Sequence, residues 1–205
     1  MFSNGQHRFK LAGLLLLAAF ATTPSTASAQ SAKEKSGLAN TVVLVIRHAE
    51  KPETGTGLTP AGEARAKAYA KYFPSYKFNG KPFHVDYIFA TADSKNSFRE
   101  RLTVEPLAAA TKLKPDLRFK NKEYQELADA MRAKSYGRNI VICWHHGKIP
   151  DLLTALGADG AKLVPGGKWP AETFDWVVQL VYDANGKVVP SKSSLVPEHL
   201  MPGDK

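Results

Sequence analysis

The 205-residue chain has a single cysteine, Cys143, which rules out an internal disulfide. Its apolar runs are short: the longest, Leu11 to Phe20, falls well below the roughly 20 residues that a membrane-spanning helix needs. No Cys/His group has zinc-ligand spacing and no acidic cage is visible, so we expect neither metal nor cofactor. With 43% hydrophobic and 23% charged residues, the composition predicts an ordinary globular domain with an apolar core.

Acidic residues are the minority charge. The chain has 28 Lys and Arg against 19 Asp and Glu, a formal net charge of +9. The basic residues are dispersed, however, and no run of five of them occurs, with or without interleaved aromatic residues. We therefore expect no nucleic-acid partner. A solvated basic surface is the plain interpretation, and electrostatic steering of anionic substrates is the alternative.

The first 29 residues have the pattern of a secretory signal peptide. Arg8 and Lys10 form a basic start, Leu11 to Phe20 is the apolar region, and Ala27-Ser28-Ala29 is an A-x-A cleavage site. The pattern predicts cleavage after Ala29 and a protein that is periplasmic or secreted, without a stable membrane span. A retained N-terminal anchor is the alternative, whereas a lipid anchor is excluded because no cysteine lies near the site.

Beyond the signal peptide, residues 30–40 are small and polar and predict a flexible leader, and residues 41–205 predict one domain. Apolar runs predict strands, and helical patterns lie between them. Pro106 should kink or divide the second helix. Strands alternating with helices favour a three-layer α/β fold, an open and mostly parallel sheet with helices on both faces. The strands are expected at 41–46, 84–90, 139–144, 174–182 and 187–189, and the helices at 59–74, 98–112, 123–134 and 150–156.

Three of the predicted strands are followed by polar groups of similar chemistry. The first ends in Arg47-His48-Ala49-Glu50, the second leads to Arg99 and Arg101, and the third ends in His145-His146-Gly147-Lys148. Ligands of open α/β sheets bind at the carboxyl ends of the strands, so these groups should converge. Arginine binds phosphate oxygens with paired hydrogen bonds, and a neutral imidazole can attack phosphorus. The pattern predicts an anion pocket suited to phosphoryl transfer.

Two of these segments carry a family resemblance. Arg47-His48-Ala49-Glu50, followed by Leu58-Thr59-Pro60-Ala61-Gly62, resembles the opening of the histidine phosphatase superfamily, which has the phosphoglycerate mutase-like fold. The resemblance implies that His48 is a nucleophile that becomes phosphorylated and that Arg47 is a phosphate clamp. The family's second arginine lies four residues before a threonine, which selects Arg99, before Thr103, over Arg101. Arg101 is then a helix-surface charge or a second clamp.

The third segment leaves two assignments open. Trp144 stands where many relatives have glycine, and two histidines follow it. Counting back five residues from Pro150, the spacing common in the family, selects His145, whereas the family's frequent His-Gly pair selects His146. Because successive strand residues point to opposite sides, we expect only one of the two histidines to face the phosphate, and we favour His145. For the acid that protonates the leaving group, the candidates are Glu123 and Glu126.

The expected activity is hydrolysis of phosphomonoesters through a phosphohistidine on His48, without metal. The export signal and small size disfavour a phosphomutase, which stays an alternative, as does a non-catalytic phosphate-binding or envelope-interaction protein on the same fold. An open, basic pocket could take a phosphorylated small molecule, a phosphoprotein or a lipopolysaccharide phosphate as substrate. The resemblance implies the last of these classes, because some exported members of the family act on it.

Overall fold

The computed structural model describes residues 1–2 and 36–204. Nearly all of the predicted signal peptide and residues 30–35 of the predicted leader lie outside this part of the chain. Among the described residues, no helix combines the length and the apolar character that a membrane crossing requires. Residues 36–204 belong to one folded unit.

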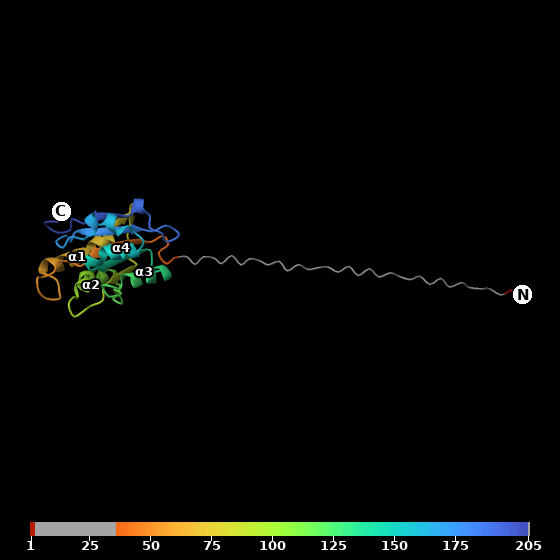
Figure 1. Ribbon diagram of the computed structural model, residues 1–205, viewed down its shortest axis with the longest axis horizontal. Helices are drawn as coiled ribbons and strands as arrows, with labels where there is room; N and C mark the ends of the chain where they lie inside the picture. The colour runs from red at the N-terminus through yellow and green to blue at the C-terminus, as the bar shows by residue number, and fades with distance from the viewer. Residues whose placement is uncertain (3–35, 205) are drawn as a thin grey trace. The chain divides into compact units, whose positions relative to one another are not determined.

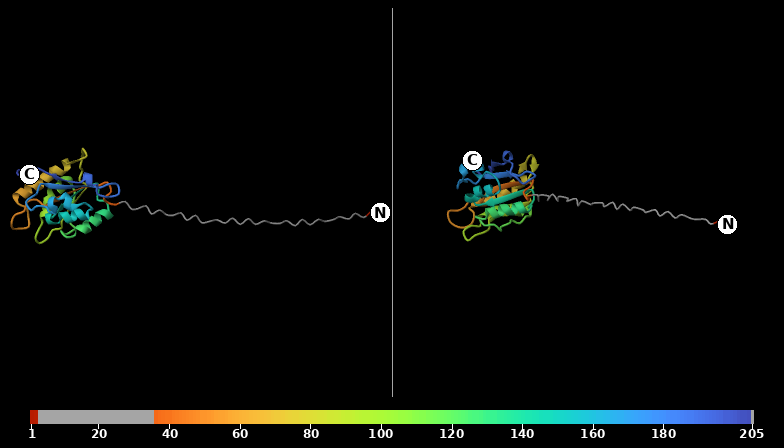
Figure 2. Two further views of the ribbon diagram at one scale, coloured as in Figure 1. Left: turned by 45° about the horizontal axis from the view of Figure 1, so that its top comes forward. Right: turned by 45° about the vertical axis from the view of Figure 1, so that its right-hand side comes forward.

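A five-stranded mixed sheet, in the order β4-β5-β1-β6-β7, forms the centre of this unit. Figures 1 and 2 show the helices packed around it. The strands β4, β5 and β1 run parallel, whereas β6 and β7 are antiparallel to their neighbours. Between the parallel strands the chain passes through helices, as the α/β prediction requires. The strands are β1 (Val42–Arg47), β4 (Tyr87–Ala90), β5 (Asn139–Trp144), β6 (Trp176–Val181) and β7 (Ser194–Pro197), with a separate hairpin of β2 (Lys77–Phe78) and β3 (Lys81–Pro82).

Every residue of β1 is buried, which shows that both faces of the sheet are covered there. Val43 and Val45 pack with α3 (Tyr124–Ala133) and α4 (Ile149–Ala155) in one apolar cluster. Val42, Leu44 and Ile46 pack on the other face with α1 (Pro60–Ser75) and α2 (Arg99–Thr111). This double burial explains the unbroken apolar run in the sequence. The predicted three-layer α/β class is confirmed.

Residues 36–40 correct the predicted boundary of the leader. The side chain of Leu38 is only 1% exposed and packs in the cluster with α3 and α4. The Gly37 N–H donates to the Arg132 carbonyl, and the Asn40 N–H donates to the Asp183 carbonyl. These contacts hold the segment against the domain, which therefore begins before residue 41.

The first helix begins where its sequence signals place it. The Thr59 side chain caps α1 by accepting from the Gly62 N–H at 3.1 Å, and Pro60 occupies the first helical turn. The Thr59 N–H donates to the Glu50 carbonyl, which ties the helix to the segment after β1. A Cβ on Gly62 would lie 2.4 Å from that same carbonyl, so only glycine permits this approach.

One predicted strand was wrong, and one of the two effects expected of Pro106 does not occur. The helix α2 is continuous from Arg99 to Thr111 and is not divided at Pro106, whereas a kink at that residue stays a prediction. The partner of β6 at the edge of the sheet is β7, whereas the predicted strand at 187–189 contributes only an isolated bridge between Tyr182 and Val188. The chain also forms short helices, η1 (His146–Lys148), α5 (Gly160–Leu163), η2 (Pro165–Gly167) and η3 (Pro190–Lys192).

Candidate active site

His48 follows the last residue of β1 and is fully buried. Its Nδ1 lies 2.8 Å from the Ala49 carbonyl oxygen. A carbonyl can only accept, so Nδ1 carries the proton of the neutral ring and Nε2 keeps its lone pair. Among the described residues, Nε2 is buried and has no hydrogen-bond partner. His48 therefore presents an unprotonated ring nitrogen, which is the form a nucleophile needs.

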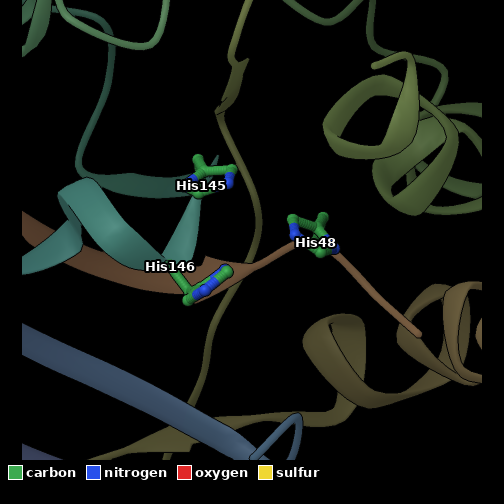
Figure 3. A group of neighbouring side chains, drawn as sticks. All are labelled: His48, His145 and His146. Atoms are coloured by element: carbon green, nitrogen blue, oxygen red, sulfur yellow. The ribbon is translucent and has the colours of Figure 1, made fainter. Parts of the chain in front are cut away.

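His145 and His146 lie on the same side of His48, and both of their rings are 5.8 Å from its ring, centroid to centroid (Figure 3). The two rings stack on each other at 4.5 Å. We expected successive residues to point to opposite sides, and this is wrong because β5 ends at Trp144. The chain then turns into η1, for which His145 is the N-cap, so the strand alternation does not continue.

The proton positions of these two rings are the reverse of that of His48. The Gly147 N–H donates to Nδ1 of His145 at 3.2 Å, and Nη2 of Arg47 donates to Nδ1 of His146 at 3.4 Å. Neither donor can accept, so each neutral ring carries its proton on Nε2. The site thus combines one ring-nitrogen lone pair with two ring N–H donors.

The three histidines also satisfy a spacing that the sequence did not show, because their ring nitrogens lie within 4.8 Å of one another. Three imidazoles with an open fourth position can hold a transition metal. Here a metal bound through Nε2 of His145 or His146 would require the proton to move to Nδ1. That move would break the bonds from Gly147 and Arg47, so the hydrogen bonding favours the metal-free arrangement.

Burial and positive charge keep all three rings neutral. Burial lowers the pKa of His48 to about 3 and that of His146 to about 4, with the nearby Arg47 guanidinium acting in the same direction. Burial, Arg47, Arg99 and Lys51 also lower the pKa of His145. The cations Arg47, Arg99 and Lys51 all lower the pKa of His145, so the potential at that ring is positive, which favours binding of an anion.

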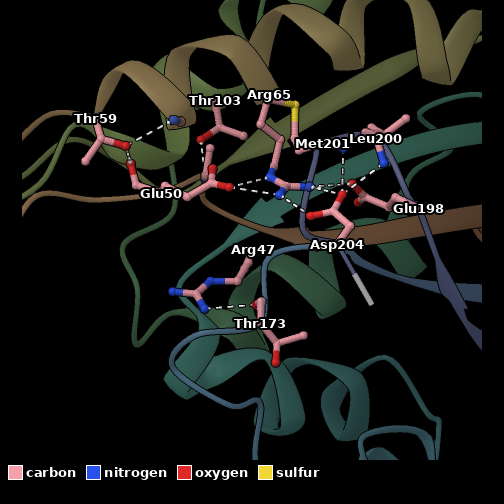
Figure 4. Close-up of polar contacts among 12 residues, drawn as sticks. Arg47, Glu50, Thr59, Arg65, Thr103, Thr173, Glu198, Leu200, Met201 and Asp204 are labelled. Carbon is pink, nitrogen blue, oxygen red and sulfur yellow. Dashed lines mark hydrogen bonds and ion pairs between the residues drawn. The ribbon is translucent and has the colours of Figure 1, made fainter.

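Arg47 is 1% exposed, and most of its donors are already used. Nη1 donates to three carbonyl oxygens of the loop before β6, those of Pro170, Ala171 and Thr173, and the bond to Thr173 is drawn in Figure 4. The guanidinium carbon also lies 3.8 Å from the centroid of the Phe174 ring. Of the three guanidinium nitrogens of Arg47, Nε alone is buried and has no hydrogen-bond partner among the described residues. Arg47 thus anchors this loop over the site, and its predicted role as a phosphate clamp stays a prediction.

Arg99 begins α2, and the segment before α1 orients its side chain. Its Nε donates to the Gly57 carbonyl at 3.2 Å, and Nη2 donates to that of Gly55. One turn later, the Thr103 hydroxyl donates to the Arg99 carbonyl and accepts from the Ala49 N–H at 2.9 Å. The four-residue spacing from arginine to threonine therefore ties α2 to the residue that follows His48.

The other charged candidates take surface or structural partners. Arg101 pairs with Asp93 at 2.7 Å and with Glu105, an arrangement of a helix-surface charge. Lys148 pairs with Asp151 at 2.8 Å. Glu50, the last residue of the Arg47-His48-Ala49-Glu50 motif, pairs with Arg65 of α1 at 2.8 Å (Figure 4).

A groove of about 760 Å³ opens beside His145. Arg99 and Glu123 both line it, whereas Glu126, in the first turn of α3, is exposed and does not. The Glu123 carboxylate accepts from the Lys120 N–H at 2.8 Å, which holds it just before α3. The structure therefore brings His145, Arg99 and Glu123 to one groove and separates Arg101 and Glu126 from it.

Sequence reasoning missed several residues of this region. Thr91 follows β4 as His48 follows β1. The rule that ligands bind at the carboxyl ends of the strands could have identified Thr91. Lys51, which acts on the pKa of His145, adjoins a recognised motif. Asn121 and Phe174 carried no signal, because neither residue type indicates phosphate chemistry on its own.

No protein-family model and no curated protein match the chain. Among solved structures, it is similar to the protein histidine phosphatase SixA complexed with tungstate, at 15% identity and a TM-score of 0.47, over 77% of this chain and 97% of that one. The chain is also similar to a candidate phosphohistidine phosphatase SixA from Agrobacterium tumefaciens, at 16% identity and a TM-score of 0.49, over 77% of this chain and 95% of that one.

A phosphoglycerate mutase from Bacillus anthracis str. Sterne is also similar, at 15% identity and a TM-score of 0.44, over 75% of this chain and 93% of that one. These similar structures are histidine phosphatase superfamily members. The chemistry proposed for this chain rests on its own residues.

Proposed function

We propose that the chain is a phosphomonoester hydrolase that works through a phosphohistidine on His48. The observation that carries the proposal is the state of the His48 ring: Nδ1–H is bound to the Ala49 carbonyl, and Nε2 is buried with a free lone pair. A nitrogen held in this state beside N–H donors and cations is arranged to attack an electrophile that carries negative charge.

In the first step, Nε2 of His48 forms a bond to phosphorus as the bond from phosphorus to the ester oxygen breaks. The departing oxygen takes a proton, for which Glu123 is the better placed of the two candidate acids because it lines the groove beside His145. In the second step, water attacks phosphorus and gives a proton to the Glu123 carboxylate, the P–N bond breaks, and inorganic phosphate leaves. His48 returns to its neutral form.

The other charged and N–H groups stabilise the transferring phosphoryl group. The Nε2–H groups of His145 and His146 supply hydrogen-bond donors near His48, and the Arg99 guanidinium lines the groove beside His145. Such positioning accounts for most of the catalysis of phosphoryl transfer. The ring of Phe174 lies 6.5 Å from that of His48, centroid to centroid, and helps to shield it. A substrate must therefore displace one of the surrounding rings to reach Nε2.

We test the proposal with p-nitrophenyl phosphate between pH 4 and 8 in the presence of EDTA. Wild-type protein should release phosphate, and His48→Ala should reduce kcat at least about a thousandfold, as the loss of a covalent nucleophile does. His84→Ala is the matched control, because His84 is exposed and lies before β4. Rapid quenching with ³²P-labelled substrate should trap an acid-labile, alkali-stable label on wild-type protein alone.

Each alternative predicts a different result. A phosphomutase would form the same labelled intermediate but pass the phosphoryl group to a second alcohol faster than to water. A non-catalytic phosphate-binding protein would bind phosphate without turnover in either protein. Equal turnover by wild type and His48→Ala would remove His48 from the role of nucleophile.

The location of this activity is the second part of the proposal. We propose that residues 1–29 direct export to the periplasm and that cleavage follows Ala29, on the basis of the sequence pattern alone. Mass spectrometry of protein isolated from the periplasm should give a chain that begins at Gln30. An intact N-terminus on membrane-bound protein would instead indicate a retained anchor.

A further inference from the structure

Thr103 of α2 has a fully buried hydroxyl group that both accepts and donates a hydrogen bond. Its Oγ1 accepts from the Ala49 N–H at 2.9 Å and donates to the Arg99 carbonyl at 2.7 Å. Because an N–H cannot accept and a carbonyl cannot donate, the hydroxyl proton points to Arg99 and a lone pair points to Ala49. The hydroxyl group therefore joins the first turn of α2 to the residue that follows His48.

The Ala49 N–H depends on this partner because it lies beyond the sheet. Strand β1 ends at Arg47, so the hydrogen bonds of the strand do not extend to Ala49, and Ala49 is fully buried, so solvent cannot bind its N–H. Thr103→Val would leave this N–H buried and unpaired, which costs free energy that a shift of the segment would relieve.

The carbonyl of the same residue decides where His48 carries its proton. Nδ1 of His48 lies 2.8 Å from the Ala49 carbonyl oxygen, which keeps the proton on Nδ1 and the lone pair on Nε2. This carbonyl belongs to the peptide group between Ala49 and Glu50, and the peptide groups on either side of it are both held. Thr103 holds the preceding one through the Ala49 N–H. The Thr59 N–H holds the following one by donating to the Glu50 carbonyl at 3.0 Å. Both threonines are drawn beside Glu50 in Figure 4.

These two supports come from different helices, and one does not replace the other. Thr59 caps α1, whereas Thr103 lies inside α2. Without the Thr103 hydroxyl, the peptide group that carries the Ala49 carbonyl is held on one side only and can rotate away from Nδ1 of His48. The neutral ring then loses the acceptor that fixes its proton. When the proton is on Nε2, that nitrogen has no lone pair with which to attack phosphorus.

We propose that Thr103 is a positioning residue that holds His48 in its nucleophilic tautomer, acting through the backbone of Ala49. The inference rests on the proposed phosphatase function, in which Nε2 of His48 attacks phosphorus, and deepens it by naming what keeps that nitrogen unprotonated. The second bond of the hydroxyl, to the Arg99 carbonyl, engages its proton and leaves a lone pair for the Ala49 N–H.

The test combines ¹H–¹⁵N spectra of the histidine rings at neutral pH with kcat for p-nitrophenyl phosphate. In wild type, Nδ1 of His48 should have the chemical shift of a protonated nitrogen and Nε2 that of an unprotonated one; the spectrum of His48→Gln assigns these signals. Thr103→Val, which removes the hydroxyl at nearly constant shape, should bring the two shifts together and reduce kcat about ten- to a hundredfold, with KM changed less than about twofold. Thr103→Ser, which keeps the hydroxyl, should restore both the shifts and kcat.

Thr111→Val is the matched control. The Thr111 hydroxyl also lies in α2 and also bonds the carbonyl four residues earlier, that of Leu107 at 2.8 Å, but it does not accept from Ala49. The ring shifts of His48 and kcat should therefore stay as in wild type. If Thr103→Val does not fold, Thr103→Cys takes its place, because a thiol of similar volume is a weaker acceptor and should give intermediate shifts.

Unchanged His48 ring shifts in Thr103→Val, or in Thr103→Cys where that variant is used, would overturn the inference even if kcat or stability falls, because Thr103 would then have only a structural role. So would a wild-type kcat in a variant whose ring is a mixture of tautomers, or ring shifts that Thr111→Val moves as far. If wild type hydrolyses no phosphomonoester, the proposed function fails separately, and the ring shifts alone decide the inference.

Discussion

At the scale of single residues, His48 should make the stability of the protein depend on pH. Its pKa in the folded state, about 3, lies below the ordinary value of 6.5 because burial, Arg47 and the other two imidazoles disfavour the charged ring. The proton-free ring is therefore favoured by the fold, and its contribution to stability is complete above pH 6.5. The contribution is lost as the pH falls from 6.5 towards 3, because the unfolded chain binds the proton first.

Replacing His48 with Gln removes this titration. Between pH 7 and pH 4, the free energy of unfolding of wild type should fall by about 3 kcal/mol more than that of His48→Gln. Denaturant melts of both proteins at the two pH values measure the difference between their changes in unfolding free energy. Titratable groups that both proteins share contribute equally to the two changes and therefore cancel. One such group is Glu198, whose pKa burial raises to about 8. Identical pH dependence in the two proteins would show that His48 is protonated as readily in the fold as in water.

Local motifs were enough to predict some of these residues. Arg47-His48 follows an apolar strand, and parallel strands deliver their carboxyl ends to one edge of the sheet. The Thr103 hydroxyl then joins the Arg99 carbonyl to Ala49, the residue after His48. The placement of His146 could not be predicted from strand alternation, since it depends on where β5 ends and how η1 begins. The groove position of Asn121 depends on a hydrogen bond to Trp144, which no local pattern reports.

At the scale of elements, the strands buried on both faces were predictable and the edge strand was not. The run at 139–144 is apolar throughout its centre and forms β5 over those same residues. The edge strand β7 contains only four residues, ends in Pro197 and takes its extended form from pairing with β6. Pairing with a neighbouring strand compensates for weak strand propensity, and such pairing cannot be recognised from a short stretch of sequence.

The continuity of helix α2 through Pro106 leads to a prediction about the effect of this proline on stability. A proline in a helix interior removes one backbone hydrogen bond and crowds the carbonyl four residues earlier, here that of Leu102. Pro106→Ala should therefore raise the free energy of unfolding by about 1–2 kcal/mol, less than the full cost of proline because the unfolded chain gains freedom. Calorimetry measures the increase in Tm.

Pro60→Ala is the control for this change, since Pro60 occupies the first turn of α1, where its missing N–H has no helical partner. Its Tm should stay the same or fall slightly. A lower Tm for Pro106→Ala than for wild type would show that the proline fits α2 without strain and that its rigidity in the unfolded chain is the larger effect.

At the scale of the whole molecule, the C-terminal segment closes onto the site from a great distance in sequence. Arg65 of α1 bonds Glu50, two residues after His48, and also Asp204, which is 139 residues away (Figure 4). Glu198 joins the same group, 3.6 Å from Arg65, and accepts from the Tyr69 hydroxyl at 3.0 Å. No motif indicated this cluster, because its members are unremarkable acidic and basic residues until the fold brings them together.

Because this cluster is buried, Arg65 should matter to stability far more than an exposed arginine does. Its side chain is 3% exposed, and Arg65→Met would leave Glu50 and Asp204 without their cation, so we expect a loss of about 3 kcal/mol or more. Arg101→Met provides the comparison: that arginine also contacts two carboxylates, but at 27% exposure, and should cost less than about 1 kcal/mol. Denaturant melts measure both, and limited proteolysis should release the C-terminal segment from Arg65→Met alone. Equal losses of unfolding free energy in the two variants would mean that the buried cluster contributes no more to stability than a surface ion pair. Apolar packing of α1 on the sheet would then be what holds the C-terminal segment in place.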